Sequence, residues 1–188
     1  VLGHYKNKSR FLKILDLGSG SGCLGLSLLE EYQNSKVSFF DVSKKSLDIV
    51  KINALNFSVS GRSKFINLDW RVDGWDVNLI KIENEIKFDI VISNPPYIRT
   101  GEIKTLQTEI KNYDPFIALN GGNDGLDSYK YIIPKLKNII KRNGKVFFEI
   151  GKGQEDFILS KGKKHKLLPI ECNKDLSGVN RVLVFIVK

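Results

Sequence analysis

The residues Asn94, Pro95, Pro96 and Tyr97 follow directly on the apolar run 89–93, which reads as a buried strand. Proline has no N–H, so neither proline can continue a sheet ladder and the strand must end here. The Asn94 side-chain carbonyl and the Pro95 backbone carbonyl, stiffened by the next proline, are two acceptors with fixed directions. Two such acceptors can hold both hydrogens of one NH2 group, and Tyr97 can stack on a flat substrate. These residues predict a clamp for a planar amide or amine.

A second candidate site is the glycine-rich segment DLGSGSG at 16–22, between an apolar run and a helical pattern. Its glycines let the backbone approach a ligand closely, and the following helix presents free N–H groups there. Asp41 ends the next apolar run 19 residues after Gly22, where an acid can accept hydrogen bonds from two ribose hydroxyls. Loop and acid predict a nucleoside-bearing cofactor, against the alternative of a turn without a ligand. The G-x-G-x-G spacing departs from dinucleotide-binding proteins and resembles the S-adenosylmethionine loop of Rossmann-like methyltransferases.

Methyl transfer to a planar nitrogen explains why the clamp needs two acceptors. An amide or aryl amine nitrogen is a poor nucleophile because its lone pair is delocalised. Two fixed acceptors orient the nitrogen, favour its pyramidalisation and stabilise the positive charge that develops on it. Asn94, Pro95 and Tyr97 are therefore the expected catalytic residues, and together with Pro96 they form the expected substrate site. The alternative is an ordinary Pro-Pro turn.

Two further features lie beside these motifs. Asp69 and Trp70 follow the third strand and can contact an adenine ring, by hydrogen bonding and by stacking respectively; the alternative is a core tryptophan with an N-capping acid. Cys23 follows the glycine loop, and we expect it to be a small buried residue that packs its helix. Cys23 and Cys172 fit no metal-ligand spacing, so no metal is expected. Two cysteines in a chain of this length indicate a reducing, cytoplasmic setting.

Apolar runs alternate with helical patterns along the whole chain. Strands are predicted in 11–22 before the glycines and at 36–41, 64–69, 87–93, 144–151, 167–172 and 180–187, and helices at 23–32, 43–57, 125–142 and 154–161, with a loop at 70–86. Ser43 is the predicted N-cap of the second helix. The alternation predicts an α/β fold in which helices cover both faces of a mostly parallel sheet. The last connection is too short for a helix, so the last strand is expected to be antiparallel. We expect one domain over 1–188.

The net charge is +9, from 30 Lys and Arg against 21 Asp and Glu. This excess is either a footprint for RNA or a general over-use of lysine, and the scattered positions favour the second. We read the basic stretch 161–166 as a solvated loop. Apolar runs are too short to span a membrane, and no signal peptide is expected. The chain opens on Val1 and contains no methionine, so we expect a segment upstream of it.

Several stretches carry a resemblance that runs from about residue 12 to the end of the chain. They are ILDLGSGSGCLGLSL, NLDW, FDIVISNPPYI, YDPFIALNGGNDGLDSYKYI, NGKVFFEIGKGQ and KDLSGVNRVLVF. These stretches resemble the HemK/PrmC family of peptide-chain release factor N5-glutamine methyltransferases. NPPY is also found in enzymes that methylate the exocyclic amine of adenine in nucleic acid, whereas ALNGGNDGLDSY is typical of the glutamine enzymes.

The resemblance implies a Rossmann-like class I methyltransferase fold with S-adenosylmethionine as cofactor. The implied substrate is the glutamine of the Gly-Gly-Gln motif in class 1 release factors. We expect a monomer, with neither a membrane nor a stable nucleic-acid partner. The residues expected at the cofactor are Asp16, Gly18, Ser19, Gly20, Ser21, Gly22, Asp41, Asp69, Trp70 and Asn94. The alternatives are an N6-adenine methyltransferase acting on RNA or DNA, and a cofactor-binding fold without catalytic activity.

The chain departs from the family pattern in three places. The N-terminal helical domain and the Pro-Arg-x-(Glu/Asp)-Thr-Glu segment that helps enclose the cofactor have no counterpart here. The family's Tyr/Phe-Glu-Pro segment reads Tyr113-Asp114-Pro115. The missing segments predict a more open site, which weakens cofactor binding and admits water.

Overall fold

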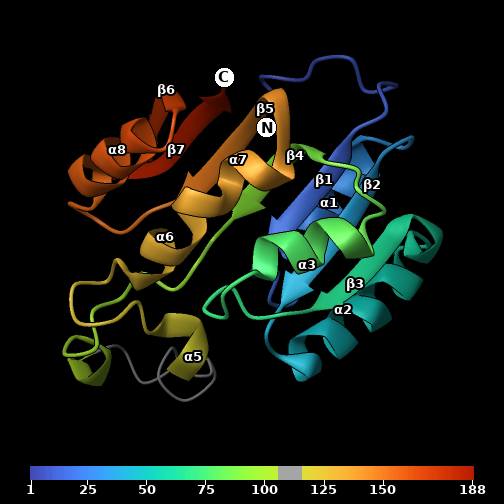
Figure 1. Cartoon of the computed structure of the whole chain (residues 1–188). Coiled ribbons are helices and arrows are strands. Elements are labelled where there is room, and N and C mark those ends of the chain that lie inside the picture. Colours follow the sequence, from blue (N-terminus) through green and yellow to red (C-terminus); the bar gives the residue numbers. More distant parts are fainter. Residues whose placement is uncertain (106–115) are drawn as a thin grey trace.

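The computed structural model describes residues 1–105 and 116–188, and its centre is a twisted sheet of seven strands (Figure 1). The strands are β1 (Lys13–Leu17), β2 (Lys36–Asp41), β3 (Ser63–Asn67), β4 (Phe88–Ser93), β5 (Ile140–Glu149), β6 (Leu167–Lys174) and β7 (Asn180–Val187). Their order is β3-β2-β1-β4-β5-β7-β6. β7 is antiparallel to both of its neighbours and the other neighbouring pairs are parallel. The predicted mostly parallel sheet with an antiparallel last strand is confirmed.

Helices cover both faces of the sheet, as the alternating pattern predicts. They are α1 (Cys23–Glu31), α2 (Lys44–Asn56), α3 (Trp75–Ile82), α5 (Phe116–Leu119), α6 (Asp127–Ile132), α7 (Leu136–Ile139) and α8 (Glu155–Lys164), with the 3-10 turns η1 (Ser60–Arg62), η2 (Ile103–Thr105) and η3 (Ile133–Lys135). The helices α1 and α2 pack on one face, and α3, α6, α7 and α8 on the other. The Ser43 hydroxyl caps α2 by accepting the Ser46 N–H at 3.2 Å, as predicted.

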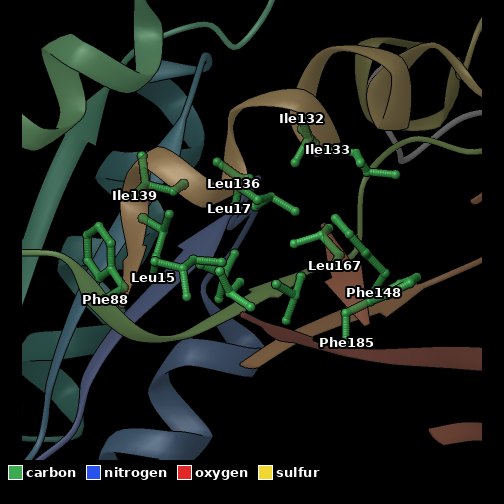
Figure 2. Packing of buried hydrophobic residues seen from close by; sticks show 14 of the residues in the cluster. Leu15, Leu17, Phe88, Ile132, Ile133, Leu136, Ile139, Phe148, Leu167 and Phe185 are labelled. Carbon is green, nitrogen blue, oxygen red and sulfur yellow. The ribbon is translucent and has the colours of Figure 1, made fainter. Parts of the chain in front are cut away.

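Both faces of the central strands are buried. In β1, Ile14 packs toward α1 and α2, whereas Leu15 and Leu17 pack toward α3 and α7. Figure 2 shows the second of these cores, where Leu15 and Leu17 lie among side chains from α7, β5 and β7. Strands that are buried on both faces read as continuous apolar runs, which explains why they were recognisable from the sequence. Among the described residues no helix is long and apolar enough to cross a membrane.

Three predicted segments differ from the structure. The predicted loop at 70–86 contains α3, whose Trp75 and Leu79 are buried one helical turn apart behind the left-handed N-cap Gly74 (φ 77°). The predicted helix at 125–142 is interrupted by η3, where Pro134 has no N–H to donate, and ends at Ile139 because β5 begins at Ile140. The basic stretch predicted as a loop provides the last turn of α8 at 161–164.

Candidate functional site

The sheet order brings the predicted site residues to one edge. β3, β2, β1 and β4 are neighbours, and their carboxyl ends lead into the segments that hold Asp69, Asp41, the glycine loop and Asn94 respectively. Ligands of open α/β sheets bind outside the carboxyl ends of strands. Residues that lie up to 78 positions apart in the sequence therefore surround one cleft.

The glycine loop is shaped for a ligand that approaches its backbone. Gly18, Gly20 and Gly22 have φ values of 81°, 54° and 85°, a region that disfavours other residues. A Cβ on Gly18 would lie 3.0 Å from the Trp70 ring. Ser19 is buried, and its hydroxyl has no hydrogen-bond partner among the described residues. An unpartnered buried hydroxyl beside a glycine cradle fits a polar ligand at this position.

The two carboxylates of the first strands have different environments. Asp41 is half-buried, and its oxygens accept the N–H groups of Gly20 and Ser43 at 2.9 and 2.8 Å. Burial raises its pKa, while these backbone hydrogen bonds oppose the rise. Asp16 is 1% exposed and accepts the Gly25 N–H at 2.9 Å. Asp41 therefore presents its carboxylate to the cleft, whereas Asp16 also fixes the start of α1.

One of the predicted adenine contacts, Asp69, is held by Arg71, which is not among the predicted site residues. Arg71 donates to both oxygens of Asp69, with its Nη2 at 2.7 Å, and this hydrogen bonding holds the pKa of the carboxyl below its usual value. Trp70 stacks on Phe40, with ring centroids 6.1 Å apart and planes 8° from parallel. Trp70 thus packs on the core and also faces the cleft. The signal that could have revealed Arg71 was a basic residue two positions after the acid.

Three adjoining hollows make up the cleft. The wide hollow, of about 420 Å³, lies between Asp41, Trp70 and Tyr131. The loop hollow, of about 240 Å³, lies between the glycine loop and Asn94. The corner hollow, of about 330 Å³, is formed by residues 94–98 and the end of α5. Pro96 lines all three hollows, so the cleft continues from the predicted cofactor residues to the predicted substrate residues.

Three consecutive carbonyls in the proline corner accept hydrogen bonds, whereas the one before them has no partner in the described part of the chain. The Pro96 carbonyl accepts the Ser128 hydroxyl at 3.1 Å. The Tyr97 carbonyl accepts the Gln154 amide at 2.9 Å, and the Ile98 carbonyl accepts the Gly121 N–H at 2.8 Å. The Pro95 carbonyl and the Asn94 side chain have no hydrogen-bond partner within residues 1–105 and 116–188. The two acceptors that the sequence singles out are therefore the two that remain available.

The hydroxyl and the carbonyl of Tyr97 are held by residues from the C-terminal half of the chain. Its hydroxyl donates to the Glu149 carboxylate at 3.2 Å. Burial, and then this acid, raise the pKa of the phenol. Gln154 donates to both the Tyr97 and Gly125 carbonyls and accepts the Gly151 N–H at 2.9 Å. Gln154 lies within the motif EIGKGQ, but its role in holding the Tyr97 carbonyl could not be predicted, because hydrogen bonds to loop carbonyls leave no periodic signal in the sequence.

Cys23 lies beside the glycine loop at the start of α1. Cys23 is exposed, with its sulfur 3.2 Å from the Ser21 hydroxyl, so the prediction of a buried packing residue is wrong. As the first residue of α1, Cys23 points away from the core that Leu26 and Leu29 fill. The segment Tyr113-Asp114-Pro115 lies outside the described residues.

The buried carboxyl group of Asp16 should make the stability of the protein depend on pH. Burial raises the pKa of its carboxyl to about 7 from 3.8, against the opposing Gly25 hydrogen bond. The folded chain keeps this proton up to about pH 7 while the unfolded chain releases it near pH 4, so this contribution to stability is lost as pH rises through 7. We expect Asp16→Asn, which cannot ionise, to gain stability relative to the parent by on the order of 4 kcal/mol between pH 4 and pH 8. Urea unfolding of both proteins across this range measures the difference, and parallel curves would contradict the prediction.

The fold is that of class I methyltransferases, with a Rossmann-like sheet. Solved structures agree on the fold: the ribosomal protein L11 methylase of Lactobacillus delbrueckii subsp. bulgaricus matches with a TM-score of 0.64 and 19% identity, over 100% of this chain and 76% of that one. A structure described as a putative rRNA-methylase from Clostridium thermocellum matches with a TM-score of 0.64 and 13% identity, over 98% and 94%. The methyltransferase small domain family model matches residues 2–113, more than half of the chain. The chain belongs to this family.

Curated relatives are similar over nearly the whole chain. The bifunctional methyltransferase of Rickettsia conorii is 39% identical over 94% of this chain and 32% of its own length. The release factor glutamine methyltransferase of Clostridium acetobutylicum is 34% identical over 96% of this chain and 61% of its own length. The chain thus spans about a third of the length of the first relative and about three fifths of the length of the second. The class takes its methyl group from S-adenosylmethionine, and the glycine cradle, the unpartnered Ser19 hydroxyl and the Asp41 carboxylate fit that cofactor.

Proposed function

We propose that the chain transfers a methyl group from S-adenosylmethionine to the side-chain amide nitrogen, N5, of the glutamine in the Gly-Gly-Gln motif of peptide-chain release factors. The observation that supports transfer to a planar NH2 is the pair of acceptors at Asn94 and Pro95, which have no hydrogen-bond partner among residues 1–105 and 116–188. The choice of glutamine is supported by relatives that are named release factor glutamine methyltransferases and are 32–35% identical to this chain.

The corner residues act on the amide in our proposal. The Asn94 oxygen and the Pro95 carbonyl each accept one N–H of the glutamine amide and set the direction of its nitrogen lone pair. As positive charge develops on the nitrogen, both dipoles stabilise it without having to reorganise. Bound S-adenosylmethionine would supply the methyl group of its sulfonium, with the neutral thioether as the leaving group, and the methylated nitrogen would then lose one proton to water. Tyr97 supports the flat amide from the side, and Pro96 separates the amide from the wide hollow.

The cofactor residues have complementary roles. Gly18, Gly20 and Gly22 bring the backbone close to the ligand, and Asp41 accepts the ribose hydroxyls. Trp70 faces the adenine. Asp16, Ser19, Ser21, Asp69 and Asn94 complete the proposed set. Within this proposal residues 1–188 form one catalytic domain that acts as a monomer in the cytoplasm, and a class 1 release factor is its partner.

The test is a methylation assay with a purified release factor. The protein is incubated with S-adenosylmethionine carrying a labelled methyl group, and the Gly-Gly-Gln peptide is examined by tandem mass spectrometry. We expect the label on the glutamine, and its loss when that glutamine is replaced by alanine. An unmodified glutamine would overturn the substrate assignment.

RNA and DNA are tested as alternative substrates in the same assay. Label that appears in RNA or DNA in place of the release factor, and that declines with salt, would support the adenine alternative. Tight cofactor binding by calorimetry with no transfer to either substrate would support a non-catalytic fold.

A further inference from the structure

At the end of the sheet opposite the cleft, a lysine lies in or directly beside each of the seven strands. This edge lies at the amino ends of the first five strands, where β7 ends and β6 begins. We call the following six residues, given in sheet order, the basic edge. They are Lys64 (β3), Lys36 (β2), Lys87 (before β4), Lys141 (β5), Lys188 (after β7) and Lys166 (before β6). The seventh strand, β1, contributes Lys13. The lysines of neighbouring strands therefore form a row.

Two acids compensate three lysines of the row, on β3, β1 and β5. Lys13 lies 2.7 Å from the buried Glu83 carboxylate and is only 12% exposed, so it is a structural ion pair. Glu83 also lies 3.5 Å from Lys64. Asp89 accepts the Lys141 ammonium at 2.9 Å. These three lysines have most of their charge compensated within the protein.

The other four lysines of the row keep their charge. Lys36, Lys87, Lys166 and Lys188 are exposed, and none has an ion pair with a described residue. Lys87 donates only to the carbonyl of Lys137, at 3.4 Å. Uncompensated lysines therefore alternate with compensated ones from β3 to β5, and two uncompensated lysines are neighbours where β7 and β6 meet.

The last turn of α8 adds to that flank. Lys161, Lys163 and Lys164 lie in this turn with no acid among them, and α8 packs against β6. The pKa of the neighbouring His165 is lowered by partial burial and by the charges of Lys161 and Lys164. Cations favour a helix C-terminus, but that preference does not account for the lysines on the strand ends beside it.

We propose that the basic edge, together with the last turn of α8, binds RNA through its ribose-phosphate backbone. Adjacent strands lie about 4.8 Å apart, and phosphates recur about every 3.4 Å along one strand of a duplex, so long lysine side chains can each meet a phosphate. The proposal rests on charge and sheet order and is independent of the glutamine substrate.

The shape of the edge favours RNA over a membrane surface. Neighbouring strands are rotated by about 20–25°, so the strand ends of a seven-stranded sheet follow a curved line. A flat lipid surface meets only part of such a line, whereas a flexible polyanion can follow it. The bound RNA would also lie a strand length, roughly 17–20 Å, from the cleft. RNA held there is a partner and not a nucleotide substrate of the Asn94 corner.

A pair of triple variants tests this proposal. The first replaces Lys163, Lys164 and Lys166 by glutamine. The control replaces Lys44, Lys45 and Lys152, which are exposed at the cleft end, and removes the same total charge. Binding of a fluorescein-labelled single-stranded oligoribonucleotide of mixed sequence is measured by anisotropy across a range of salt concentrations. Calorimetry with S-adenosylmethionine confirms that each variant is folded.

We expect the first triple variant to bind RNA at least tenfold more weakly at low salt. Its plot of log affinity against log salt should be shallower by about 2, since each lost contact to single-stranded RNA removes about 0.7 from the slope. The control variant should stay close to the parent. Equal losses in both variants would overturn the proposal, because net charge alone would then explain binding. Binding to phosphatidylserine vesicles without binding to RNA would also overturn it.

Discussion

Replacement of Asn94 by alanine is expected to abolish methyl transfer while leaving the binding of S-adenosylmethionine measurable. The variant removes one of the two free acceptors in the corner, and the remaining Pro95 carbonyl cannot orient an NH2 group alone. Removal of one preorganised group of this kind costs about 10²–10³ in rate. Single-turnover transfer to a release factor measures the loss, and calorimetry measures cofactor binding.

Two companion variants define the role of Asn94. Asn94→Asp keeps a side-chain oxygen at the same position, so we expect it to retain part of the rate that the alanine variant loses. Asn173→Ala removes an exposed asparagine on β6 and should match the parent. Turnover by Asn94→Ala equal to that of the parent would overturn the two-acceptor clamp, whatever the substrate.

The sheet could be predicted from the sequence because its central strands are buried on both faces. Each of these strands is an apolar run, and the glycines and prolines that end β1 and β4 mark the carboxyl edge. Parallel strands in a doubly wound order place these ends together, so the proximity of Asp41, the glycine loop and Asn94 could be predicted from the expected fold. The site assignments themselves stay predictions.

The parts that could not be predicted depend on contacts between distant segments. α3 has eight residues and begins after a left-handed glycine, so its pattern is too short to distinguish from a loop. Arg71 holds Asp69 through side-chain hydrogen bonds that no periodicity encodes. The same is true of Ser128 and Gln154, which lie 32 and 57 residues from the corner carbonyls that they bind.

Replacement of Gln154 by alanine is the second change with a large expected effect. Gln154 is 8% exposed, and its amide joins Tyr97, Gly125 and Gly151 through three hydrogen bonds. Each of the three groups left without a partner costs about 1–3 kcal/mol, so we expect a loss of at least about 3 kcal/mol in unfolding free energy. We also expect kcat to fall, since the Tyr97 carbonyl is no longer tied down and the free acceptors beside it lose their fixed direction.

A matched destabilised variant separates positioning from stability. Leu79→Ala leaves a cavity in the buried face of α3 and should cost about 2–5 kcal/mol without contact to the corner. The exposed Gln33→Ala provides a neutral glutamine control. At a temperature where all the variants are folded, Leu79→Ala should keep the parent kcat, whereas Gln154→Ala should lower kcat and leave the dissociation constant for S-adenosylmethionine unchanged. If both buried variants keep the parent kcat, Gln154 only stabilises the fold. If Gln154→Ala instead weakens cofactor binding and keeps kcat, its hydrogen bonds shape the cofactor cleft and not the clamp.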